Sequence, residues 1–136
     1  MKWIKKFEAS SLRVRDELKE FCEMNLAYLM DDDYHVMITR RDSLPIDENY
    51  HKKGLIIHFY RWHQGNREGF NWVEVENHFI PFIQRLSKEY TIIECIIDEC
   101  IIDYGATKYI IPIEDLLNGI VPKRLIERIL VIVSEE

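Results

Sequence analysis

The chain has 136 residues and a formal net charge of −6, and this length fits a single globular domain over residues 1–136 that buries a core of its own. An apolar and aromatic content of 47% excludes a disordered chain, and the negative net charge excludes long-range attraction to nucleic acid over the whole surface. Apolar runs are too short to cross a bilayer, and the N-terminus lacks the apolar stretch of a secretory signal. We therefore expect a soluble protein with no membrane partner and a cytoplasmic location.

The charges are distributed unevenly along the chain. Residues 1–15 carry five basic side chains and one acidic one, whereas residues 16–35 carry one and seven. Residues 40–67 carry six basic and three acidic side chains, and residues 68–136 carry six and thirteen. This distribution allows a basic strip on an acidic body.

A first helix is predicted over residues 11–30. Ser10 and Ser11 can act as N-caps, because a serine hydroxyl accepts a bond from the unpaired amides of a first helical turn. The apolar residues that follow recur at helical spacing: Val14, Leu18, Phe21, Cys22, Leu26 and Leu29.

Two strands are predicted next, in "DDDYHVMITRRDS" and "KKGLIIHFYRWHQG", which are rich in branched and aromatic residues between turn formers. Strict alternation in the second strand places two sets of side chains on opposite faces. One set is Leu55, Ile57, Phe59 and Arg61, and the other is Ile56, His58, Tyr60 and Trp62. Neither set is uniformly polar, which predicts a central strand.

The rest of the chain predicts a second helix and further strands. Asn71 can cap a helix over residues 72–90, and Pro81 is expected to bend it. Residues 91–104 fit a strand pair that turns near Asp98 and Glu99, although a helix stays open as an alternative. "KYIIP" extends the sheet, "PIEDLLNG" fits a short helix and "RILVIVSE" a closing strand.

The resulting fold prediction is an α+β domain, in the order helix, strand, strand, helix, strands. A mainly antiparallel sheet is expected, covered on one face by the two long helices.

The stretch "RWHQGNREGFNW", residues 61–72, is the first candidate binding surface. Its two glycines indicate a turn that lets polar side chains from both ends lie near one another. Tryptophan and arginine are favoured anchors in protein interfaces, and both also stack on unpaired bases. The partner-binding candidates are Arg61, Trp62, His63 and Arg67. In the alternative interpretation the aromatic residues of this stretch pack into the core: Tyr60, Trp62, Phe70 and Trp72. The exposure of the two tryptophans to solvent decides between a binding surface and core packing.

The acidic turn of Asp31, Asp32 and Asp33 is the second candidate. It follows the first helix, where the helix dipole disfavours negative charge. This placement suggests a divalent cation or a basic partner, although a solvated acidic turn is the commoner explanation. No EF-hand spacing accompanies it.

Neither a metal nor a cofactor is predicted. The three cysteines, Cys22, Cys95 and Cys100, contain no CxxC pair. His58 and His63 are five residues apart, so in a strand they point to opposite faces and do not share one ion. Glycine-rich phosphate loops and catalytic elbows are absent from the sequence, which leaves no catalytic residue to assign.

The segments "LAYLMDDDYHVMI" and "FNWVEVENHFIPFIQRLSKEYTI" resemble small uncharacterised proteins encoded by tailed bacteriophages. In that family an acidic turn precedes a strand and an F-x-W signature opens the second helix. The resemblance covers about residues 3–97 and rests on these positions: Leu26, Leu29, Asp31, Val36, Phe70, Trp72, Phe79, Phe82, Leu86 and Tyr90. It implies a viral origin, hence the host cytoplasm, and no particular activity.

Three functional hypotheses follow. The first is a non-enzymatic accessory protein that binds a host or viral protein. The second is RNA or single-stranded DNA binding at the basic and aromatic corner over residues 58–72, helped by Lys52 and Lys53. The third is a metal-free nuclease that uses His58 or His63. Homodimerisation through an exposed sheet edge is compatible with each of them.

Overall fold

The computed structural model describes residues 2–41, 54–99, 108–121 and 124–134, with side chains from Arg13 onward except that of Arg41. In chain order the elements are α1 (Lys2–Asn25), α2 (Ala27–Met30), β1 (Tyr34–Arg41), β2 (Gly54–His63), β3 (Asn66–Glu68), α3 (Trp72–Glu89), β4 (Ile92–Glu99), β5 (Lys108–Ile111), α4 (Ile113–Leu117) and β6 (Ile126–Ser134). Within these ranges no helix has the length and apolar character needed to cross a membrane.

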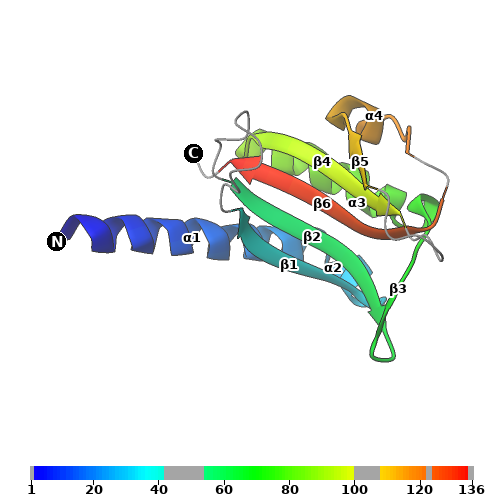
Figure 1. Ribbon diagram of the computed structural model, residues 1–136, viewed down its shortest axis with the longest axis horizontal. Coiled ribbons are helices and arrows are strands. Elements are labelled where there is room, and N and C mark those ends of the chain that lie inside the picture. Colours follow the sequence, from blue (N-terminus) through cyan, green and yellow to red (C-terminus); the bar gives the residue numbers. More distant parts are fainter. Residues whose placement is uncertain (1, 42–53, 100–107, 122–123, 135–136) are drawn as a thin grey trace.

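The strands form one antiparallel sheet in the order β1-β2-β6-β4-β5, and β3 pairs with the end of β2. The helices α1 and α3 lie on one face of this sheet, and none of the described helices lies on the other (Figure 1). The predicted α+β fold is therefore confirmed.

The core lies between the sheet and these two helices and is rich in aromatic rings. Phe79 of α3 is at its centre, since its ring lies 5.1 Å from that of Phe59, 5.8 Å from that of Trp72 and 5.6 Å from that of Phe82. All four side chains are buried. Each buries a large apolar area, so this cluster contributes a large share of the stability.

Strand β2 is central, as its composition predicts, because β1 pairs with one of its edges and β6 with the other. Leu55, Ile57 and Phe59 are buried among the helices. The alternate residues Ile56, His58, Tyr60 and Trp62 therefore point to the other face. This second face of the sheet is called the open face below, because no described helix covers it.

The first helix begins earlier than predicted. It runs without interruption from Lys2, so Ser10 and Ser11 lie inside it and the prediction that they cap it is wrong. Lysine, glutamate and alanine before these serines are strong helix formers, and two serines inside a long helix cost too little to end it. The helix ends at Asn25, and after Leu26 the single turn of α2 leads into the acidic turn.

The second half of the chain departs from the prediction at one place. Strand β4 continues through Asp98 and Glu99, so the turn predicted there is wrong. Asp98 lies opposite Arg128 of β6 and Lys108 of β5, and these partners stabilise an acidic residue within the sheet. Residues 100–104, the other half of the predicted strand pair, lie outside the described residues.

The remaining predicted elements are present. Helix α3 runs through Pro81 as one element. Asn71 is the N-cap before its first residue, and the Asn71 backbone nitrogen donates to Glu74 Oε2 over 3.1 Å. The strand β5 and the short helix α4 fall within their predicted segments, and the closing strand β6 begins two residues earlier than predicted, at Ile126.

Candidate binding surface

The turn inside the first candidate surface is a two-residue hairpin between β2 and β3. His63 pairs with Asn66, and the two residues between them, Gln64 and Gly65, have positive φ of 51° and 80°. Two consecutive residues with positive φ match the twist of the flanking strands, and glycine adopts this conformation without steric cost. Gly65 thus explains the sharp reversal of the chain.

The alternation of the strand divides the predicted corner between two faces. Arg61 lies on the helix side, where its guanidinium sits 5.5 Å from the centre of the Tyr34 ring and 3.8 Å from Glu68 Oε2. Trp62 and Arg67 are directly opposite each other in the hairpin, so both lie on the open face. The expectation that Arg61 and Arg67 share one surface is therefore not met.

The two candidate surfaces are neighbours. The backbone nitrogen of Trp62 donates to the Asp33 carbonyl oxygen over 2.9 Å. The Nδ1 atom of His63 lies 2.6 Å from Asp33 Oδ2, and Asp31 and Asp32 are exposed beside them. Asp33 has a positive φ of 67°, which turns the chain from α2 into β1. The acidic turn and the hairpin therefore belong to one end of the sheet.

The aromatic residues of the corner separate into buried and exposed ones. Phe70 is 1% exposed and Trp72 is 7% exposed, so both belong to the core, whereas Trp62 is 43% exposed. The packing interpretation thus holds for Phe70 and Trp72, and Trp62 is left at the surface.

Tyr60 lies beside Trp62 on the open face and has two stacking neighbours. The His35 ring of β1 stacks on it at 5.8 Å, and the Arg67 guanidinium of β3 lies 5.0 Å from its centre. Arg67 also lies 3.7 Å from Glu127 Oε1. Glu127 is the extra residue of a β-bulge, because Asp98 pairs with Arg128 and Glu99 with Ile126. Such a bulge redirects side chains, and here it brings Glu127 to Arg67.

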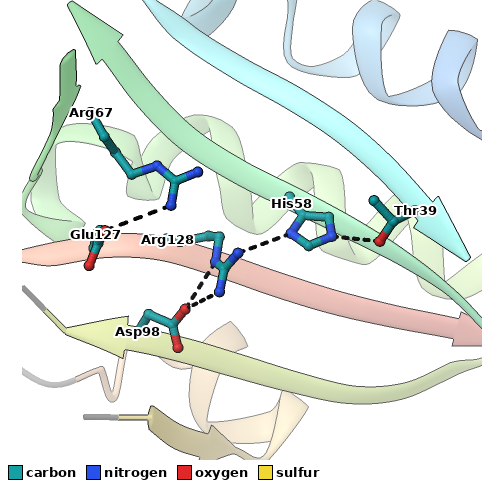
Figure 2. Close-up of polar contacts among 6 residues, drawn as sticks. All are labelled: Thr39, His58, Arg67, Asp98, Glu127 and Arg128. Carbon is teal, nitrogen blue, oxygen red and sulfur yellow. Dashed lines mark hydrogen bonds and ion pairs between the residues drawn. The ribbon is translucent and has the colours of Figure 1, made fainter. Parts of the chain in front are cut away.

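A row of polar contacts crosses the open face over four strands (Figure 2). Asp98 Oδ2 accepts from Arg128 Nε over 2.9 Å and from Nη2 over 2.7 Å. Arg128 Nη1 lies 3.5 Å from His58 Nδ1, and His58 Nε2 lies 2.7 Å from Thr39 Oγ1. Both His58 and Asp98 are buried. We call Thr39, His58, Arg128 and Asp98 the polar row.

His58 of the polar row is neutral at pH 7, because its pKa is lowered. Burial is the main cause that lowers its pKa, and the positive charges of Arg128 and Arg67 lower it further, to about 4. Because arginine only donates, Nδ1 accepts from Arg128 and the proton of the neutral ring is on Nε2, which donates to Thr39. Both ring nitrogens thus have partners, which argues against His58 as the base of a nuclease.

The sequence did not indicate the polar row. A pattern of period two places His58 and Asp98 in strands, but only the pairing of β2 with β6 and of β6 with β4 brings them to one arginine. Strand register depends on contacts between distant segments.

In the described ranges, no group of three or more histidine, cysteine, aspartate or glutamate side chains is placed to hold a metal ion. Cys22 and Cys95 are buried, and burial raises the pKa of each thiol to about 12. Such thiols are protonated and unreactive. Lys52 and Lys53, expected to assist nucleic-acid binding, lie outside the described residues.

Comparisons with family models, with curated proteins and with solved structures find no match to this chain. What the site does is therefore inferred from its own geometry.

Proposed function

We propose that the protein is a non-catalytic accessory protein, of the kind implied by its resemblance to phage-encoded proteins, and that it binds a protein partner through the open face around Trp62. The observation that carries this proposal is the exposure of Trp62, 43%, on a face that no described helix covers. Tryptophan in the centre of an interface is among the residues that contribute most to binding, because it buries a large area at low entropic cost. Met37, also 43% exposed, lies on the same face.

The charges around Trp62 favour a protein partner over a nucleic acid. Both arginines of the hairpin already lie beside a carboxylate, Arg61 beside Glu68 and Arg67 beside Glu127, and the His63 ring lies beside Asp33. Nucleic-acid binding gains its free energy mainly from cationic side chains that neutralise the backbone phosphates. Arginines that are paired with carboxylates offer little of this gain, whereas mixed charges at the rim are typical of protein interfaces.

Single-stranded nucleic acid is the second candidate, because Trp62 and Arg67 lie together on an exposed sheet face and aromatic and guanidinium planes both stack on bases. Titration of a labelled oligonucleotide at several salt concentrations tests it. A contribution from Arg67 predicts that Arg67→Ala lowers the slope of log K against log salt by about one. An absence of signal at low salt excludes this candidate.

The protein-binding proposal is tested by affinity capture from a host cell lysate with matched variants. Trp62→Ala is expected to weaken binding of the captured protein at least about 30-fold, as the loss of a central tryptophan anchor does. Val73→Ala is the control, because Val73 is also exposed but lies on α3, on the other side of the sheet. A partner that binds Trp62→Ala as tightly as the wild type contradicts the proposal.

A further inference from the structure

The unpaired charge around the exposed Trp62 side chain is negative. Both arginines of the hairpin already lie beside carboxylates, and Asp33 is in contact with His63. Asp31 and Asp32, in contrast, are exposed, and neither side chain has a hydrogen bond or an ion pair within the described residues. This end of the sheet therefore combines an exposed indole with two carboxylates that have no cationic partner.

Two contacts hold the acidic turn in place beside Trp62. The Asp33 carbonyl oxygen accepts from the Trp62 backbone nitrogen over 2.9 Å, and Asp33 Oδ2 lies 2.6 Å from His63 Nδ1. These contacts follow directly after Asp31 and Asp32 in the chain, so the backbone of both residues is fixed relative to the indole. A partner that meets the indole and the carboxylates together has little of this surface to order, which favours binding.

The stability of the fold does not explain the position of these carboxylates. Asp31 is the C-cap of α2, and Asp32 follows it. The C-terminal end of a helix carries a partial negative charge, so carboxylates there are unfavourable, and neighbouring like charges repel each other. Sequences depart from such local rules mainly at functional sites. The acidic turn therefore fits an interface better than a structural role.

We propose that the partner bound around Trp62 is a basic protein segment, whose lysine or arginine side chains meet Asp31 and Asp32 while an apolar side chain beside them packs on Trp62. This inference rests on the function proposed above and specifies the chemistry of the partner. A nucleic acid fits this surface less well, because the two carboxylates repel its phosphates. The net charge of the chain, −6, also attracts a basic partner and speeds its association.

The probe for this inference is a display library of random peptides, selected on the wild type and on the double variant Asp31→Asn, Asp32→Asn. Peptides selected on the wild type are expected to contain apolar residues and more lysine and arginine than acidic residues. The double variant is expected to select peptides without this excess of positive charge. The proposal is overturned if the wild type selects no peptides or peptides without a positive excess, if both proteins select the same peptides, or if a labelled oligonucleotide binds the wild type more tightly than they do.

Affinity measurements separate a local charge effect from a change in net charge. A selected basic peptide, labelled for fluorescence anisotropy, is expected to bind Asp31→Asn, Asp32→Asn at least about tenfold more weakly than the wild type and with a smaller dependence on salt. The matched control is Asp16→Asn, Glu20→Gln, which removes two exposed carboxylates from α1 and changes the net charge equally. The control is expected to change the affinity less than about twofold. Equal weakening by the two double variants contradicts the proposal.

The variant Trp62→Ala distinguishes a failure of this inference from a failure of the proposed function. If Trp62→Ala weakens peptide binding and Asp31→Asn, Asp32→Asn does not, the surface binds a partner that positive charge does not select, and this inference alone is wrong. If neither variant weakens binding, both proposals are wrong for this surface.

Circular dichroism melting shows whether the two carboxylates have a structural role instead. Asp31→Asn, Asp32→Asn is expected to keep or raise the melting temperature, because it removes charges that a helix C-terminus disfavours. A marked fall in the melting temperature of this variant contradicts the proposal.

Discussion

Replacing Arg128 with methionine is expected to lower the free energy of unfolding by about 3–5 kcal/mol, the usual cost of leaving a buried charge without its partner. Asp98 is 3% exposed, and both of its hydrogen bonds from Arg128 go to Oδ2. Its other oxygen, Oδ1, is buried with no hydrogen-bond partner among the described residues. Without the guanidinium the buried carboxylate loses both of these hydrogen bonds and the cation that donates them. Urea unfolding of the variant and the wild type measures the difference.

The double variant Arg128→Met, Asp98→Leu distinguishes a charge effect from a packing effect. A buried ion pair replaced by apolar residues of similar volume is often close to neutral in stability, so the double variant is expected to recover most of the loss. Arg13→Ala is the control, because its exposed pair with Glu17 contributes at most about 0.5 kcal/mol. A double variant as unstable as Arg128→Met contradicts this account of the polar row.

Acidification is expected to destabilise the protein through His58. Its pKa is about 4 in the folded state, below the ordinary value of 6.5, so the unfolded chain binds more protons between these two values. The stabilisation is complete above pH 6.5 and is lost as the pH falls from 6.5 towards 4. A shift of this size corresponds to about 2 kcal/mol lost between pH 7 and pH 5, and about 3 kcal/mol at the limit.

The variant His58→Asn tests this linkage, because asparagine retains polar atoms near Thr39 but does not titrate. The free energy of unfolding is measured at intervals from pH 7 to pH 5 for both proteins. The variant is expected to lose about 2 kcal/mol less than the wild type over this interval. His78→Asn removes an imidazole that stacks on Tyr28, on the helical side of the molecule, and is the matched control. Equal pH dependence of His58→Asn and the wild type contradicts the expectation.

These two experiments address one structural feature, since Arg128 both neutralises Asp98 and helps to lower the pKa of His58. A polar row in the middle of a sheet face restricts the strands to one register, because any slip leaves Asp98 without its arginine. The polar row therefore holds the open face in the arrangement that exposes Trp62.

Local sequence patterns were sufficient to predict the class of fold and most of its elements. The alternation in residues 55–62 identified both faces of β2, and Asn71 located the start of α3. The faces of a strand and the start of a helix depend on residues that are close together in the sequence, because side-chain alternation and capping act within one element. The extension of α1 to Lys2 was missed because serine, although it favours the N-cap position, is also tolerated inside a helix.

The candidate surface required the tertiary structure. The sequence indicated that Trp62 and Trp72 flank a turn, but not that Trp72 enters the core while Trp62 stays exposed. It also did not show that Asp33 meets His63, or that Asp98 meets Arg128. These contacts join residues 30 positions apart in the chain, and they depend on which strands pair and in which register. The sequence by itself therefore determined the elements and their buried faces, because those follow from local apolar periodicity. The tertiary structure decided which polar side chains meet, because strand register is set by the packing of the whole sheet.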